Sequence, residues 1–182
     1  MQGPDLMSSV VPQFFPAHWL EDSPDIAFTD FSSCIRIGYV IRGDGQYSYL
    51  HRDELAKAGL TLCELHSTAL HNLHSLTPIH FSVAKTPGGS EAFLGDTDDN
   101  FRAARILLPE VHEALVGELG EEYFAAIPCR DWFFCWSKQQ AHEWQARNIS
   151  QARSDFLDDD YRLTPDILWR SKTGFSLYNP VS

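Results

Sequence analysis

The segment before Phe101 carries acidic and amide side chains at the spacing with which calcium-binding loops begin. Asp96, Asp98 and Asn100 follow a D-x-D-x-N pattern, in which oxygen ligands on alternate residues converge on one hard cation. However, Phe101 stands where such a loop needs glycine for its sharp turn, and Leu107 stands where a bidentate glutamate should close the site. We therefore interpret the segment as a solvated acidic turn whose carboxylates favour the N-terminus of a following helix.

Three histidines lie on one expected helix. His71 and His74 are three residues apart and close enough in angle to share a metal ion, whereas His66 is nearer the edge of the core. No HExxH motif and no cysteine–histidine knuckle accompanies them in the sequence. We therefore interpret them as exposed helix histidines and predict no metal site.

Other catalytic signatures do not occur in the sequence either. It contains no GxGxxG loop, no P-loop and no nucleophile elbow, so dinucleotide, nucleoside-triphosphate and serine-hydrolase chemistry have no local signature. We expect no cofactor. The aromatic run Trp132–Trp136 puts three rings on one face, which would line a pocket or pack in a central strand. We favour the packing interpretation.

Composition predicts one globular domain with an acidic charge balance. The chain has 182 residues, of which 43% are hydrophobic, and its 14 Lys+Arg against 25 Asp+Glu give a formal charge of −11. A chain of this length forms a full core without disulfides or metals. No lysine or arginine precedes Arg36, and gripping a phosphate backbone needs clustered cations, so we expect no nucleic-acid partner.

The sequence also predicts a cytoplasmic location. Its opening is interrupted by Pro4, Pro12 and Pro16 and lacks the basic start and apolar stretch of a secretion signal. No apolar run reaches the roughly 20 residues needed to cross a bilayer, so we expect no membrane partner. The cysteines have no CxxC spacing and sit in apolar runs, which favours buried, reduced thiols. They are Cys34, Cys63, Cys129 and Cys135.

The elements that must position any site begin after a stretch without periodicity. Residues 1–33 predict a weakly structured N-terminal arm. Residues 34–182 predict a single α+β domain, with a mixed or mostly antiparallel sheet and three to five helices packed on it. Alternation over 34–41 indicates a strand, followed by a turn at 43–45 and a return strand over 46–50.

Helices and further strands follow. A short helix over 52–58 should end at Gly59, and the T-x-x-E capping box of Thr61 and Glu64 starts a helix with a leucine-rich core stripe. Strands are expected at 79–84 and 92–94, a helix through Leu107, and a helix from Pro109 to near Gly120. The remaining expected elements are central strands at 124–127 and 132–136, a polar helix at 138–152, and strands at 163–169 and 175–178.

Three phrases of the sequence point to one family: TALHNLHSL at 68–76, DNFRAARIL at 99–107 and AIPCRD at 126–131. In their order and spacing they resemble the YtpQ-like family, a bacterial domain of unknown function, from about Cys34 into the last strands. Family members usually carry a longer N-terminal portion, which is shortened and replaced here. The resemblance implies a bacterial protein but supplies no activity. The matching residues are Ala69, Asn72, Leu73, Leu76, Asp99, Phe101, Ala103, Arg105, Pro128 and Asp131.

Four polar residues at matching positions form the candidate ligand-binding site: Asn72, Asp99, Arg105 and Asp131. Asn72 lies at the edge of its helix's apolar stripe, so its amide should bond either a neighbouring loop's backbone or a ligand. Asp99 and Arg105 are six residues apart, which does not place them on one helix face. We therefore expect Arg105 to meet Asp131 as a bidentate ion pair, or the three residues to form a substrate-facing cluster.

Two functions follow from these features. The first is a non-enzymatic, acidic protein-binding domain whose charge steers a basic protein partner, as in an immunity or inhibitor protein that covers a cationic enzyme surface. The alternative is a small-ligand-binding protein or an enzyme, with the carboxylates of the candidate site as acid and base and its arginine holding an anionic group. The sequence predicts no particular oligomeric state.

Overall fold

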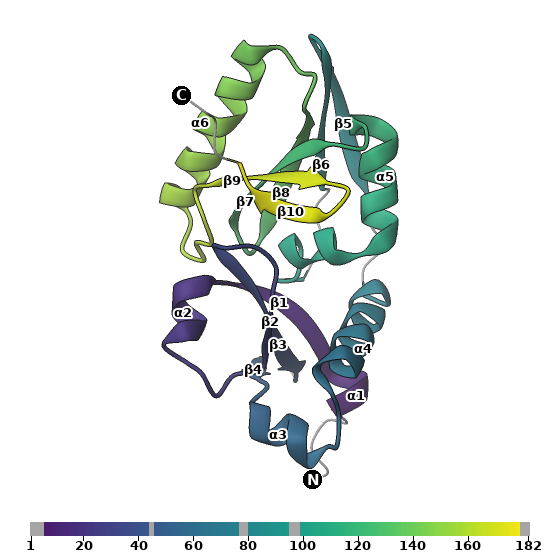
Figure 1. Cartoon of the computed structure of the whole chain (residues 1–182), viewed down its shortest axis with the longest axis vertical. Helices are drawn as coiled ribbons and strands as arrows, with labels where there is room; N and C mark the ends of the chain where they lie inside the picture. Colours follow the sequence, from purple (N-terminus) through teal and green to yellow (C-terminus); the bar gives the residue numbers. More distant parts are fainter. Residues whose placement is uncertain (1–5, 44–45, 77–79, 95–98, 179–182) are drawn as a thin grey trace.

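A computed structural model describes residues 6–43, 46–76, 80–94 and 99–178 and shows an α+β domain built on two antiparallel sheets (Figure 1). The smaller sheet comes from the first part of the chain and the larger sheet from the rest. The predicted fold class is confirmed. The described residues form six α-helices, where three to five were expected, because two short helices occur in the N-terminal stretch.

The smaller sheet is organised around its longest strand. β1 (Val10–Pro16), β3 (Ile35–Arg42) and β2 (Phe28–Asp30) lie in the order β1-β3-β2, and β4 (Tyr47–Tyr49) also pairs with β3. β2 pairs with residues 36–38 of β3, and β4 pairs with residues 40–42. The expected hairpin is confirmed, and the turn residues Asp44 and Gly45 lie outside the described residues.

The expectation that residues 1–33 form a weakly structured arm is wrong for the part that the structure describes. Helix α1 (Leu6–Ser9) leads into β1, which pairs with β3 along its whole length, and helix α2 (Ala17–Glu21) follows. Val10 and Phe14 are buried. The prolines of this stretch argue against a strand, but β1 lies at an edge of its sheet, where a residue without an N–H group is tolerated.

Helices α3 (Arg52–Lys57) and α4 (Leu62–His74) follow as predicted. The capping box is confirmed: Thr61 Oγ1 accepts a hydrogen bond from the Glu64 amide at 3.2 Å, and the Glu64 carboxylate accepts one from the Thr61 amide at 2.9 Å. Gly59 has a φ of +69°, the left-handed conformation expected where α3 ends. The predicted stripe of α4 faces the core through Leu65, Ala69 and Leu73.

The larger sheet has the strand order β10-β9-β7-β8-β6-β5, with every neighbouring pair antiparallel. The two predicted central strands are confirmed as β7 and β8, and both are almost completely buried. The strands are β5 (Phe81–Thr86), β6 (Gly89–Leu94), β7 (Tyr123–Cys129), β8 (Trp132–Ser137), β9 (Ile167–Ser171) and β10 (Gly174–Leu177).

Helices α5 (Pro109–Leu119) and α6 (His142–Asp158) lie on opposite sides of the larger sheet (Figure 1). Pro109 is the first residue of α5, as predicted. Helix α6 begins at His142 rather than Lys138 and continues to Asp158 rather than Ala152. Residues 103–107 form a 3-10 helix, η1 (Ala103–Leu107), where an α-helix was expected.

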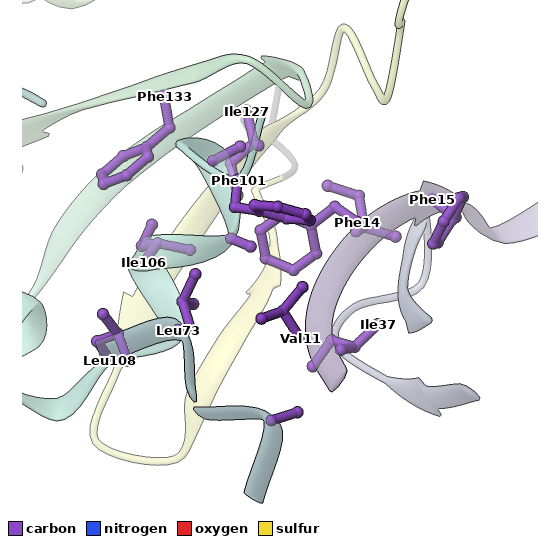
Figure 2. Close-up of a cluster of buried hydrophobic side chains, with 14 of the residues drawn as sticks. Val11, Phe14, Phe15, Ile37, Leu73, Phe101, Ile106, Leu108, Ile127 and Phe133 are labelled. Atoms are coloured by element: carbon purple, nitrogen blue, oxygen red, sulfur yellow. The ribbon is translucent and has the colours of Figure 1, made fainter. Parts of the chain in front are cut away.

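One hydrophobic cluster joins the two sheets. It includes Phe14 of β1, Phe101 and Ile106 from the segment around η1, and Ile127 of β7. Figure 2 shows the side chains of Phe14 and Phe101 pointing toward one another, with Phe15 on the other side of β1. The two sheets therefore share a core and are not separate lobes.

The aromatic run of β8 is part of the packed interior. Phe133 belongs to the main cluster, whereas Phe134 and Trp136 belong to a second cluster that includes Ala152 of α6. The packing interpretation of this run is therefore confirmed.

The cysteines are free but differ in burial. Cys129 and Cys135 are buried, as predicted, whereas Cys34 is half-buried and Cys63 is exposed. Burial raises the pKa of the Cys129 thiol to about 12, and the nearby Asp159 carboxylate adds to this rise. The Cys129 thiol is therefore protonated at neutral pH.

Candidate functional site

Asn72 of α4 has a structural role. Its Nδ2 donates one hydrogen bond to the Met7 carbonyl at 2.9 Å and another to the Val10 carbonyl at 2.8 Å. Both amide hydrogens are thus used to fasten the junction of α1 and β1 to α4. Of the two expected alternatives, bonding to a backbone is the one observed.

Arg105 pairs with Asp99, so the predicted pair with Asp131 is wrong. Arg105 Nη1 and Nη2 donate to the two Asp99 carboxylate oxygens at 2.7 and 2.5 Å, and the Arg105 side chain is fully buried. α-Helical spacing does not apply to this pair because Asp99 lies in a turn ahead of η1. There the Asp99 carboxylate also accepts a hydrogen bond from the Phe101 amide at 3.0 Å.

Asp131 lies in the two-residue turn between β7 and β8, next to Arg130 in the sequence. Its Oδ1 is 3.9 Å from Arg130 Nε, an ion pair without a hydrogen bond. Burial raises the pKa of Asp131 above its ordinary value, Asp159 adds to this rise, and Arg130 opposes it. The four candidate residues therefore do not build one site: Asn72 braces the N-terminal strand, Asp99 neutralises a buried arginine, and Asp131 accompanies a different arginine.

Two of the three histidines on α4 form hydrogen bonds to groups on other elements. His74 Nδ1 bonds the Glu110 carboxylate of α5, and His66 Nδ1 bonds the Tyr39 hydroxyl at 3.0 Å. Within the described ranges, no group of three or more His, Cys, Asp or Glu side chains is placed to hold a metal ion. Asp96 and Asp98 lie outside the described residues.

Two polar clusters elsewhere, one buried and one half-buried, hold elements of the larger sheet together. Glu91 Oε1 of β6 accepts hydrogen bonds from Gln140 Nε2 at 2.9 Å and from Asn148 Nδ2 of α6 at 2.8 Å. Arg170 Nη2 of β9 donates to His112 Nε2 at 2.9 Å, which leaves the His112 Nδ1 hydrogen to bond the Tyr123 hydroxyl at 3.1 Å. Both clusters satisfy buried groups within the fold.

One hollow in the described surface lies where the β3–β4 hairpin meets the β7–β8 turn. It has a volume of about 640 Å³. Tyrosine and arginine side chains dominate its lining, and Asp99 is the single member of the expected site that reaches it. Its lining residues are Arg42, Gly43, Gln46, Tyr47, Tyr49, Asp99, Asn100, Phe101, Arg130 and Tyr161.

Arg130 lines this hollow and contacts two of its tyrosines. Its guanidinium carbon lies 3.4 Å from the centre of the Tyr161 ring and 5.7 Å from that of Tyr47, and Nη1 donates to the Tyr47 hydroxyl. The side chain is 13% exposed, so the two rings hold a largely desolvated cation, a setting in which cation–π attraction is strongest. Within the described part of the chain, the buried Arg130 Nε has no hydrogen-bond partner.

A second hollow of about 310 Å³ adjoins the first and shares Tyr49, Arg130 and Tyr161 with it. Aromatic rings connect the two: Phe15 stacks on Trp19 with ring centres 5.1 Å apart, and both lie within 5.6 Å of the Tyr49 ring. We call the combined lining the Arg130 surface. Its further residues, from the second hollow, are Phe14, Phe15, Pro16, His18, Trp19, Asp160, Arg162 and Leu163.

Backbone contacts fix the position of Arg130. Its amide donates to the Tyr161 carbonyl at 3.1 Å, and its carbonyl accepts from the Ala103 amide at 3.2 Å. In the smaller sheet, Arg42 of β3 pairs with Tyr47 of β4, and this register places the end of the β3–β4 hairpin next to Arg130. The Arg130 surface is therefore assembled from both sheets and from the loop after α6.

A close approach in the smaller sheet places Phe15. A Cβ atom at Gly38 of β3 would lie 2.6 Å from Phe15 Cε2, so only glycine leaves room for this ring. On the same aromatic surface, burial raises the pKa of the Tyr49 hydroxyl, which therefore stays a neutral donor at pH 7. Guanidinium and phenol groups of this kind donate hydrogen bonds to anions and pack against apolar groups, which is binding chemistry.

Sequence reasoning missed this surface because its residues are far apart in the chain. The available signals were the two aromatic residues of the β4 strand and an arginine in the short turn between two buried strands. Neither signal belongs to a recognisable sequence motif. Tyr47 and Arg130 are also 83 residues apart, so the sequence does not indicate that they meet.

Comparisons with known proteins find no match for this chain. A scan against protein-family models finds no match, and searches of curated proteins and of solved structures find none either. The YtpQ-like resemblance therefore stays a prediction. Among the described helices, none combines the length and apolar character needed to span a membrane.

Proposed function

We propose that this protein is a non-enzymatic protein-binding domain and that the Arg130 surface is its interface. One observation carries the proposal: Arg130 is held between the rings of Tyr47 and Tyr161 where two adjoining hollows meet. Tyrosine, tryptophan and arginine are the residues most enriched at the energetic centres of protein interfaces. Tyr161 is 51% exposed, so a large aromatic group faces solvent next to this arginine.

The charged groups of this surface favour binding over catalysis. Arg42 and Arg130 supply positive charge, while the Asp99 carboxylate is already bound to Arg105. The free state of all four cysteines supports the proposed cytoplasmic location.

Selection of peptides from a random display library on the immobilised protein tests the proposal. We expect the enriched peptides to lose about tenfold in affinity, equivalent to about 1.4 kcal/mol, with Tyr161→Ala or Arg130→Met. The exposed Arg153 of α6 does not line either hollow, so Arg153→Met is the matched control and should bind like wild type. Peptides that bind all three variants equally well, or no enrichment at all, contradict the assignment.

A basic partner, as expected from the net charge, would use the acidic residues at the end of α6 instead. Asp155 and Asp158 lie near the end of α6 and Asp159 directly follows it; burial raises the pKa of Asp155, and the charges of Asp158 and Asp159 add to the rise. This acidic cluster favours an immunity- or inhibitor-like role as a second candidate. A lysine-rich peptide should then bind wild type at low salt and bind Asp158→Asn more weakly, whereas equal binding to both contradicts this candidate.

A further inference from the structure

Resting on the proposed function, we infer that the Arg130 surface recognises a partner's peptide segment that presents a carboxylate next to an aromatic or large apolar side chain. The carboxylate binds at Arg130 in the larger hollow, and the apolar side chain packs in the smaller one. The two hollows share Tyr49, Arg130 and Tyr161, so neighbouring side chains of one extended segment reach both.

The state of Arg130 argues for an anionic group. Tyr161 and Tyr47 pack against its guanidinium, and Nη1 donates a hydrogen bond to the Tyr47 hydroxyl. Nε is buried and makes no hydrogen bond to any described residue. A planar guanidinium with unused donors in a partly desolvated site matches the two oxygens of a carboxylate.

The surrounding charges leave the larger hollow favourable for one negative charge. Arg42 is exposed on its lining, and both Asp99 oxygens already accept from Arg105. Among the described residues, Asp131 is the competing carboxylate that forms an ion pair with Arg130, at 3.9 Å from Nε and without a hydrogen bond to it. An incoming carboxylate therefore replaces a weak internal ion pair with direct hydrogen bonds.

In the smaller hollow, the Asp160 carboxylate offsets the positive charge that Arg162 contributes. Arg162 Nε and Nη2 donate to the carbonyls of Asp159 and Leu157 at 2.8 and 2.6 Å, and Asp160 adds an exposed carboxylate. Together with Asp131, these carboxylates disfavour a doubly charged phosphate more than a singly charged carboxylate. For this reason we assign a carboxylate and not a phosphate group.

The aromatic lining argues for the apolar neighbour. Phe15 and Trp19 stack, and Pro16 and Leu163 complete the apolar part of the smaller hollow. Trp19 is half-buried, so part of its ring remains available to a ligand. An aromatic or large apolar side chain buries this surface, whereas alanine covers little of it.

Titration of the full chain with short blocked peptides tests the inference. The probes are acetylated and amidated Gly-Glu-Phe-Gly, the same peptide with Gln for Glu, the same peptide with Ala for Phe, and the same peptide with phosphoserine for Glu. Tryptophan fluorescence and calorimetry report binding. We expect the Glu-Phe peptide to bind, salt to weaken it, and each of the other three to bind about tenfold more weakly.

Substitutions of the neighbouring residues Arg130 and Asp131 should change peptide affinity in opposite directions. Arg130→Met should abolish the preference for Glu over Gln. Asp131→Asn removes the internal competitor and should tighten binding of the Glu-Phe peptide several-fold. Tyr161→Ala, at a residue that is half exposed, checks the site should Arg130→Met fold poorly, and Arg153→Met should change nothing.

The outcomes separate this inference from the proposed function. Equal binding of the Glu and Gln peptides, tighter binding of the phosphoserine peptide, or no effect of Asp131→Asn overturns the carboxylate assignment. If library peptides of another composition still depend on Tyr161, the protein-binding proposal stands without it. If neither the blocked peptides nor the library yields a Tyr161-dependent ligand, both proposals fall.

Discussion

Asp99 and Arg105 form a bidentate ion pair whose arginine is fully buried, with hydrogen bonds of 2.7 and 2.5 Å. The pair links the turn before η1 to the core. The same turn is held from the smaller sheet, because Gln13 Nε2 of β1 donates to the Asn100 carbonyl at 2.7 Å. Polar contacts thus connect β1 to the turn before η1, and Asp99 and Asn100 of this turn line the Arg130 surface.

Removing the carboxylate of this pair should destabilise the whole fold. Asp99→Asn leaves a buried guanidinium charge unpaired, and we expect a loss of about 3–5 kcal/mol in the free energy of unfolding, measured with urea. Adding Arg105→Met should restore more than half of the loss, because the buried charge is then gone. The exposed pair of Asp53 and Lys57 is the control, and Asp53→Asn should leave the unfolding midpoint unchanged. A similar effect of Asp99→Asn and Asp53→Asn contradicts the structural role.

Asn72 should contribute to stability through the N-terminal strand. Asn72→Ala removes the donors of two hydrogen bonds to the Met7 and Val10 carbonyls, and we expect a loss of about 1–3 kcal/mol. Faster hydrogen exchange across β1 should accompany it. The neighbouring exposed His71 on α4 provides the control, and His71→Ala should leave exchange in β1 as in wild type. Unchanged protection of β1 in Asn72→Ala contradicts this assignment.

Gly38 should control the aromatic part of the Arg130 surface. The methyl group of Gly38→Ala collides with the Phe15 ring, so we expect an altered tryptophan fluorescence spectrum and a loss of about 1–3 kcal/mol. In the interior of α5, a Cβ atom at Gly117 meets nothing within 4 Å, and Gly117→Ala should stabilise the protein by about 0.5–1 kcal/mol. The same sign of effect at both glycines refutes the proposed collision with Phe15.

Stability should fall as the pH decreases through about 6.5. Burial lowers the pKa of His66, and burial together with the charge of Arg170 lowers that of His112. The unfolded chain therefore binds more protons than the folded protein in this range, and the free energy of unfolding decreases as acid is added. Urea unfolding between about pH 7.5 and about pH 5.5 measures the slope. The double variant with His66→Gln and His112→Gln should show a shallower slope, and an unchanged slope excludes these histidines as its cause.

The elements that the sequence predicts well are those with local determinants. The capping box of Thr61 and Glu64, the left-handed Gly59 and the proline at the start of α5 each specify a helix end within a few residues of chain. The two central strands are apolar on both faces, and this pattern predicts burial on both faces without knowledge of which strands lie beside them.

The errors concern positions whose structure depends on distant partners. Strand β1 is not predicted because Pro12 and Pro16 argue against a strand. A strand tolerates proline at the edge of a sheet, and that position is not visible in the local sequence. Helical spacing separates Asp99 from Arg105, but the segment forms a turn and a 3-10 helix, which bring the two together. The Arg130 surface requires the positions of Tyr47 and Tyr161, and neither is set by the residues around Arg130 in the chain.

Arg130 connects the two sheets. Its backbone forms hydrogen bonds to Tyr161 and Ala103, and its side chain donates to Tyr47 of the smaller sheet. A molecule that binds there would contact residues of both sheets at once. Occupancy would then raise the melting temperature of the entire domain, so a thermal-shift screen can search for partners of this protein without any assay of activity.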